Sequence, residues 1–232
     1  HCDVLHGCEL ATRNVAESTP EGERALLADA ADGRLDDTSL LEAAIIAGGQ
    51  RSRAGELVNH IARTSRNLLD KENAGESERD LAQQIFENLH QTVLRGRYLS
   101  HCSDCSVALT QGDFNCVTAT VLYIQALRDH GIPAHAYAMV GHVFCRVGED
   151  EFDVETTCPR WFQLSRREAN AAARRAAAGR NRDRSTARRL SDVELIGKIY
   201  YNRGVACFRA KDFEKGMLLT KRSLLLDAQD EV

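Results

Sequence analysis

Residues 111–159 constrain this chain more than any other stretch, because they combine a helix pattern, strand patterns and several chemically reactive side chains. From Cys116 to His130, apolar residues recur every three or four positions, the spacing that gives a helix one apolar face. Pro133 cannot continue that helix. We therefore predict a helix with Cys116 in its first turn. The unpaired amides and the dipole at a helix start favour a cysteine thiolate, and they can also stabilise an oxyanion.

Three strands are predicted after this helix. Residues 132–140 form the first, and residues 142–147 alternate as the second, which begins with His142. A polar turn at residues 148–151 leads into the third strand, residues 152–156. The segment therefore predicts a small antiparallel sheet that follows the helix.

The register of the second and third strands decides where two carboxylates lie. If Val147 pairs with Phe152, then Asp153 and Glu155 share the face of His142, and Glu155 is the nearer of the two. A slip by one residue would turn both carboxylates to the opposite face. We predict the first register, which places both acids on the face of His142.

These motifs resemble the transglutaminase-like superfamily of cysteine enzymes. The resemblance covers roughly residues 80–165 and rests on the order and spacing of the motifs. They are Asn115-Cys116 at a helix start, Gly131-Ile132-Pro133-Ala134 at its end, Gly141-His142-Val143-Phe144 on a strand, and Val154-Glu155-Thr156-Thr157 on the next.

The resemblance implies a papain-like core and a catalytic triad. Cys116 would be the nucleophile, His142 its base, and an acid would orient the histidine. As the third residue of this triad the family usually has Asp, which is preceded by an aliphatic residue and followed two positions later by Thr. Glu155 fits that position, whereas Asp153 has the usual residue type but comes two positions early. We favour Glu155 and keep Asp153 as the second candidate.

The activity implied by this resemblance is hydrolysis or acyl transfer at the amide bonds of a protein or peptide substrate, without a metal or an organic cofactor. Gln111 and Asn115 are candidate side-chain donors to an oxyanion. A cysteine or a histidine by itself more often has a structural role. The cysteine and the histidine together, in a context that matches the family, favour an enzyme. The alternative is a catalytically inactive transglutaminase-like scaffold that binds protein partners.

Composition narrows the class of protein. A chain of 232 residues with a formal net charge of -4 is not expected to bind nucleic acid, and no apolar run reaches the length of a membrane span. The chain begins with His rather than Met, so we expect a fragment or a processed product. A nucleophilic thiol must stay reduced, which favours a reducing compartment such as the cytoplasm.

The spacing His101-Cys102-x-x-Cys105 would suit half of a zinc site, with Cys145 and Cys158 as candidate partners. The partner spacing is not that of a zinc ribbon or finger. We therefore favour cysteines in a loop near the active-site cleft.

The remaining chain divides by pattern. Residues 1–75 are predicted as a helical N-terminal region, including helices at 38–47 and 51–69, and residues 76–165 as the core, which opens with a helix at 76–94. Residues 96–112 read as a loop-rich approach to the nucleophile. The Arg/Ala-rich stretch 166–189 is interpreted as a connector. The predicted class is α+β.

Residues 190–232 resemble one tetratricopeptide repeat, a pair of antiparallel helices. Gly204 stands where the two helices would touch, Phe213 opens the second helix, and Asp227 stands near its end. Such repeats imply binding of a protein or peptide. One repeat cannot bury its own faces, so either further repeats follow or the pair docks on the core.

Overall fold

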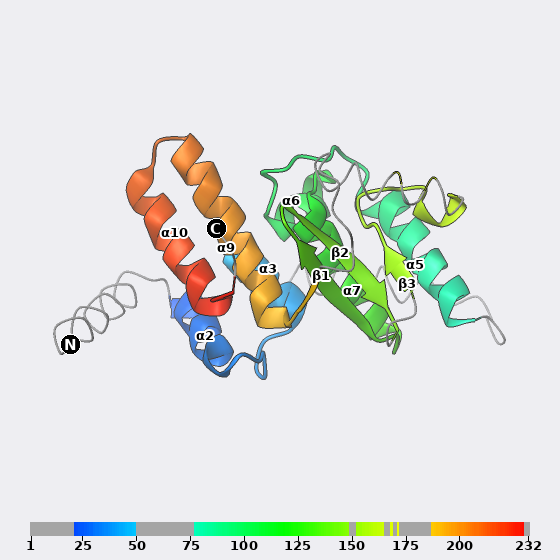
Figure 1. Cartoon of the computed structure of the whole chain (residues 1–232), viewed down its shortest axis with the longest axis horizontal. Helices are drawn as coiled ribbons and strands as arrows, with labels where there is room; N and C mark the ends of the chain where they lie inside the picture. Colours follow the sequence, from blue (N-terminus) through cyan, green and yellow to red (C-terminus); the bar gives the residue numbers. More distant parts are fainter. Residues whose placement is uncertain are drawn as a thin grey trace.

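The computed structural model describes the chain in several ranges, and within them it has seven α-helices and one four-stranded antiparallel sheet (Figure 1). The α+β class predicted from the sequence is confirmed. The predicted helix at 51–69 and most of the connector at 166–189 lie outside the described residues. The described ranges are 21–49, 77–148, 152–164, 168, 171 and 187–229.

Two helices form the described part of the N-terminal region, α2 (Glu21–Asp29) and α3 (Leu40–Gly48), with a 3-10 turn between them (Ala30–Asp32). Ser39 caps α3 through its hydroxyl, which accepts a hydrogen bond from the amide of Glu42. The backbone amides of Asp37 and Thr38, just before this cap, donate to the Asp29 carboxylate at 3.0 and 3.1 Å.

Helix α5 (Glu78–Thr92) matches the helix predicted at 76–94, and Ser77 and Asp80 form a capping box at its start. The short helix α6 (Cys105–Gln111) was not predicted, because residues 96–112 read as loop. Asp104 caps its start through the amide of Ser106, and Gly112 ends it with a φ of 85°. A helix of seven residues is too short to show a periodic pattern in the sequence.

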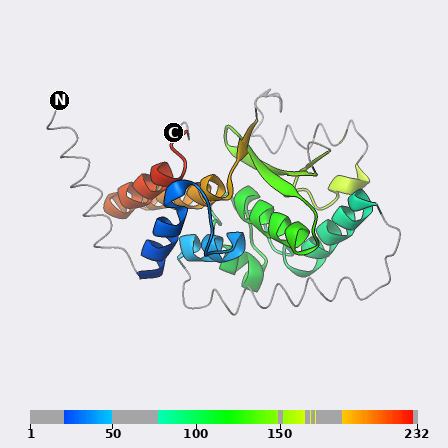
Figure 2. The ribbon, with the colours of Figure 1, turned by 90° about the horizontal axis from the view of Figure 1, so that it is seen from below.

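The core is built on α7 (Cys116–Asp129), which lies against one face of the sheet (Figure 2). The strands are β1 (Ala134–Met139), β2 (His142–Val147), β3 (Phe152–Val154) and β4 (Arg188–Leu190), in the order β3-β2-β1-β4. A 3-10 turn (Trp161–Gln163) follows β3 and packs its aromatic residues on the core.

The predicted register between the second and third strands is confirmed, because Val147 pairs with Phe152 and Arg146 with Asp153. Strand β4 is a correction. It falls at the end of the predicted connector and pairs with β1, with Ala136 opposite Leu190. The end of the Arg-rich stretch is therefore part of the sheet.

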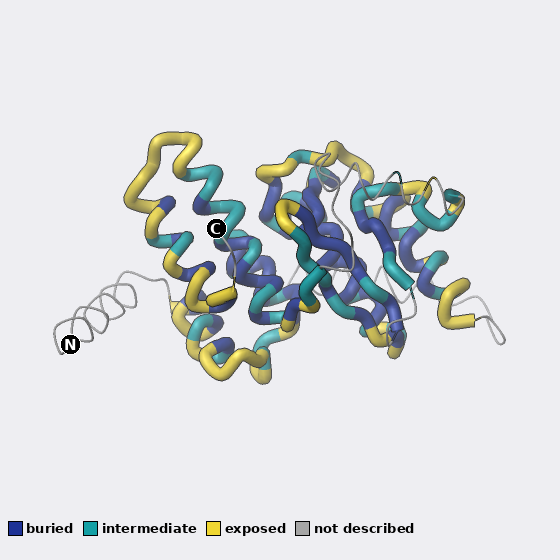
Figure 3. The backbone as a smooth tube through the Cα atoms, in the orientation of Figure 1, coloured by how far each residue is buried: buried dark blue, intermediate teal, exposed yellow. Residues whose placement is uncertain are grey.

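Helices α9 (Asp192–Arg209) and α10 (Phe213–Leu226) form the antiparallel pair predicted from the sequence. They touch at Gly204, where an added Cβ would lie 2.8 Å from the hydroxyl oxygen of Thr220. The pair docks on the rest of the chain through α9, which packs on α3 and α7. Figure 3 shows that α9 is more buried than α10. The sequence left open whether further repeats follow this pair or the pair docks on the core. Within the described residues, the pair docks on the core.

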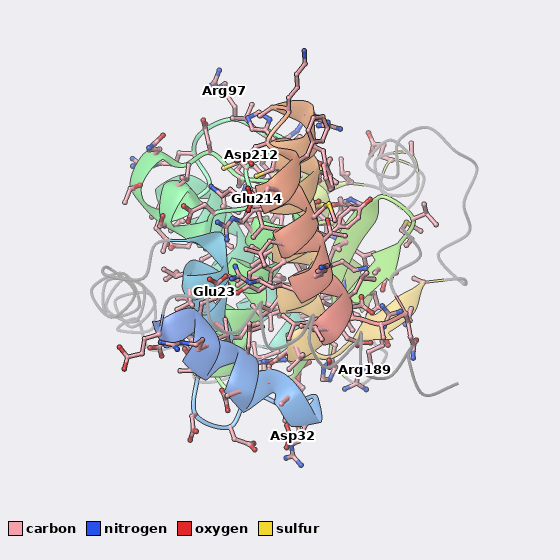
Figure 4. All side chains as sticks on the ribbon, turned by 90° about the vertical axis from the view of Figure 1, so that its left-hand side faces the viewer. Glu23, Asp32, Arg97, Arg189, Asp212 and Glu214 are labelled. Atoms are coloured by element: carbon pink, nitrogen blue, oxygen red, sulfur yellow. The ribbon has the colours of Figure 1, made fainter. Side chains whose placement is uncertain are left out.

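A buried ion pair ties α10 to the N-terminal region. Arg222 Nη1 lies 2.8 Å from Glu23 Oε1 of α2, and both side chains are almost fully buried (Figure 4 labels Glu23). Because Glu23 lies on α2 and Arg222 on α10, this contact can form only while the α9–α10 pair is docked on the N-terminal helices.

We expect Glu23→Ala to lower the free energy of unfolding by about 3 kcal/mol, because it removes the buried acid that pairs with the Arg222 guanidinium. Removing both charges with Glu23→Leu and Arg222→Met should recover most of that loss. Urea denaturation followed by circular dichroism measures both. Arg34→Ala is the control, because its pair with Asp36 is exposed and should contribute less than about 1 kcal/mol. Equal losses in E23A and R34A would contradict the prediction.

Candidate active site

The start of α7 holds Cys116 in place. The Asn115 side-chain oxygen accepts a hydrogen bond from the amide of Thr118 at 2.9 Å, and the Thr118 hydroxyl accepts one from the amide of Asn115 at 2.9 Å. The Asn115 side-chain nitrogen donates to Ser103 Oγ at 2.8 Å and to the Ser100 carbonyl. This capping box fixes the backbone at the cysteine, so Cys116 sits in the first turn as predicted.

The same contacts bear on the two predicted oxyanion donors. Both ends of the Asn115 amide are occupied within the protein, which leaves no support for Asn115 as a donor to substrate. Gln111 is exposed at the end of α6 and does not line the cavity that holds Cys116. First-turn amides of α7 other than that of Thr118 are further candidate donors, because the first amides of a helix have no intrahelical acceptor.

His142 and Glu155 form a buried pair. His142 Nε2 lies 2.8 Å from Glu155 Oε2, and each side chain is 1% exposed. The other carboxylate oxygen of Glu155 accepts a hydrogen bond from the Thr157 hydroxyl at 2.9 Å. The antiparallel register brings the first residue of β2 next to the residue that follows β3. Glu155 thus orients the imidazole, and Thr157 in turn fixes the carboxylate of Glu155.

Asp153, the second candidate for the acid, lies elsewhere on the hairpin. Its carboxylate oxygen is 2.7 Å from Arg146 Nε, and its backbone carbonyl accepts a hydrogen bond from Trp161 Nε1 at 3.0 Å. Of the two predicted acids, the structure brings Glu155 into contact with His142.

Cys116 and His142 line one cavity of about 850 Å³. Burial opposes protonation of His142, but interaction with Cys116 and Glu155 outweighs it and raises the pKa of the imidazole to about 10. The imidazolium is the form that pairs with a thiolate. Because Nε2 faces Glu155, Nδ1 is the ring nitrogen left to exchange a proton with Cys116. It is buried and forms no hydrogen bond with any described residue.

Tyr98 is a site residue that the sequence did not single out. Its segment runs parallel to the one before Cys116: the amide of Phe114 donates to the Arg97 carbonyl at 3.1 Å, and that of Leu99 donates to the Phe114 carbonyl at 2.8 Å. The side chain of Tyr98 is half-exposed, and partial desolvation together with Cys116 and Glu155 raises the pKa of its hydroxyl. The hydroxyl of Tyr98 therefore keeps its proton. No periodicity in the sequence marks it.

His90 is the second residue that the sequence missed. Its Nε2 lies 3.1 Å from the Thr156 carbonyl, directly after Glu155, and the Thr156 hydroxyl lies 2.9 Å from that of Thr120 on α7. Burial lowers the pKa of His90 to about 4, so the ring is neutral and donates through Nε2. These contacts anchor the backbone that carries Glu155.

The described residues include no group of three or more His, Cys, Asp or Glu side chains that could hold a metal ion. Cys102 donates through its sulfur to the Asp113 carbonyl at 3.3 Å, and Cys105 is fully buried at the start of α6, where burial raises its pKa. The six cysteines in the described ranges are free thiols. No helix in those ranges is long and apolar enough to cross a membrane.

Comparison of the chain with protein-family models, with curated proteins and with solved structures found no match.

The raised pKa of His142 makes a prediction about stability. The imidazole has a pKa of about 10 in the folded protein against 6.5 when unperturbed, so the folded state keeps a proton that the unfolded state releases. Its stabilising contribution is complete below pH 6.5 and is lost as the pH rises towards 10. We expect the free energy of unfolding to fall over that window, and His142→Gln to flatten the fall.

Urea denaturation at a series of pH values measures this slope. His101→Gln is the matched control, because His101 is exposed and should leave the slope unchanged. A slope that is the same in H142Q as in the unmodified chain would contradict the assignment of a protonated His142.

Proposed function

We propose that this protein is a transglutaminase-like cysteine enzyme that acts on amide bonds, with Cys116 as nucleophile, His142 as acid and base, and Glu155 as the residue that orients the imidazole. The observation that carries the proposal is the 2.8 Å contact between His142 and Glu155, at the wall of the cavity that also holds Cys116. A buried imidazolium between a carboxylate and a thiol is the arrangement that activates a sulfur nucleophile.

In the first half of the reaction the Cys116 thiolate attacks the carbonyl carbon of the amide, and a C–S bond forms. The electron pair of the C=O bond moves to oxygen. Backbone amides in the first turn of α7 stabilise this oxyanion. The amide of Thr118 is not one of them, because it already donates to the side-chain oxygen of Asn115. His142 then gives its Nδ1 proton to the leaving nitrogen, the C–N bond breaks, and a thioester remains on Cys116.

In the second half, neutral His142 takes a proton from an incoming water or amine, which attacks the thioester. The C–S bond breaks and the thiolate and imidazolium are restored. Water gives hydrolysis, and an amine gives acyl transfer. Glu155 keeps its contact with Nε2 through both halves, because it is held in turn by Thr157.

The first test is the reactivity of Cys116. We expect iodoacetamide at about pH 6.5 to alkylate Cys116 faster than Cys158 or Cys207. Accessibility alone predicts the opposite order, because Cys116 is only 8% exposed and the other two are half-buried. His142→Ala should slow the reaction at Cys116 about tenfold by removing the neighbouring positive charge. Peptide mapping by mass spectrometry follows each cysteine. Faster labelling of Cys158 and Cys207 would refute the nucleophile assignment.

The second test separates the two acids. We expect Glu155→Gln to slow alkylation of Cys116 about tenfold, because the imidazolium loses its buried counter-ion. Asp153→Asn is the matched control and should leave the rate unchanged, since Asp153 lies beside Arg146. Slower alkylation in Asp153→Asn, with an unchanged rate in Glu155→Gln, would show that Asp153 is the acid of the triad.

The second candidate function is that of a catalytically inactive scaffold that binds protein partners through the α9–α10 pair. The observation in its favour is the outer face of α10, where Phe213, Met217 and Leu225 are each more than half exposed. A Cys116 that is no more reactive than Cys158 would favour this candidate.

A further inference from the structure

The cavity at Cys116 has a second wall that the triad does not explain. One wall is the start of α7 and the turn between β1 and β2, with Cys116 and His142. The other is formed by β4, α9 and the residues after α10. Figure 1 shows the β1–β2 turn beside α9. The polar residues on this second wall are Arg188, Lys198, Tyr201, Asn202 and Gln229.

The charged side chains that line this cavity are all basic. Lys198 and Arg188 line it, and none of the described residues that line it is an Asp or Glu. The acids that hold these cations lie behind them: Asp227, with a side chain that is 0% exposed, is 3.0 Å from Lys198 Nζ and 2.7 Å from Arg188 Nη2. Arg188 also contacts Glu194.

The opposite wall adds to the same field. The N-terminus of α7 opens onto the cavity at Cys116 and Val117, and a helix start carries a partial positive charge. His142 stands beside it with its counter-ion Glu155 buried behind the ring, outside the lining of the cavity. A concave site with cations on both walls attracts an anion and concentrates it there.

We propose that this cavity takes a substrate that carries a carboxylate close to the amide bond attacked by Cys116, and that Lys198 binds this carboxylate. The inference rests on the proposed function and names its substrate class, a peptide with an acidic side chain or a free C-terminus near the reacting bond. It also gives α9 a role in choosing the substrate.

Lys198 is better suited to this role than Arg188. Both oxygens of Asp227 accept from Arg188 Nη2, at 2.8 and 2.7 Å, and Nη1 contacts Glu194, so the guanidinium is held by acids on two sides. The Lys198 ammonium is a point charge with three donors, and its side chain is 12% exposed. Replacing Lys198 leaves Asp227 paired with Arg188, so the wall keeps its structure.

The test compares two alkylating reagents of equal length, N-iodoacetylglycine and N-iodoacetylglycinamide. In both, the Cys116 sulfur forms a bond to carbon and displaces iodide. Only the first carries a carboxylate. We expect the ratio of their rates at Cys116, anionic over neutral, to fall about fivefold in Lys198→Gln, the effect of losing one partly buried charge contact. Lys198→Arg keeps the charge and should keep the ratio, which guards against a merely structural effect.

Lys221→Gln is the matched control, because it removes the same charge from an exposed position on α10 and should leave the ratio unchanged. A ratio that is unchanged in K198Q, with normal labelling by the neutral reagent, would overturn the carboxylate inference and leave the proposed function intact. Labelling of Cys116 by neither reagent above the level of Cys158 would overturn the proposed function itself.

A third reagent separates the two sources of the carboxylate. The N-iodoacetyl derivative of aspartic acid α-amide carries it as a side chain, whereas N-iodoacetylglycine carries it as a chain end. The reagent whose rate falls more in Lys198→Gln identifies which of the two the cavity takes. A fall in neither counts against the inference.

Discussion

The burial of α7 is the constraint on which the rest of this structure depends. A helix that is covered on nearly all sides must satisfy its polar side chains inside the protein. Tyr123 donates to the Ala82 carbonyl of α5 at 2.9 Å, Thr120 contacts Thr156, and Thr118 is bonded to Asn115. Each of these contacts fixes a neighbouring segment relative to the helix. Cys116 is therefore positioned by the core rather than by a surface loop.

The same constraint explains how the acid and the base are held. Thr156, bonded to α7 through its hydroxyl and to His90 through its carbonyl, follows Glu155 directly. The backbone at Glu155 is thus anchored from α7 and α5 together. The nucleophile comes from α7, the imidazole from β2 and the acid from the segment after β3. All three are positioned relative to the same buried helix, α7. The cavity is completed from outside this core by β4 and α9.

Much of the core could be predicted because its signals are local. Apolar spacing marked α7, alternation marked β2, and the turn after Val147 was enough to work out a register that pairs Arg146 with Asp153. The elements that were missed are short. Strand β4 has three residues and is defined by its pairing with β1, and α6 has seven. Neither carries a periodic pattern long enough to distinguish it from loop.

The sequence by itself determined the cysteine at a helix start, the histidine at a strand start, and two acids of which one lies on the following strand and the other directly after it. It could do so because helix and strand periods depend on neighbouring residues alone. Tertiary structure decided between the two acids, because packing places Glu155 against His142 and Asp153 against Arg146. It also brought Tyr98 and His90 to the site and placed Arg188 and Lys198 on the cavity that holds Cys116. Those contacts join residues that are distant in sequence, and only the folded chain brings such residues together.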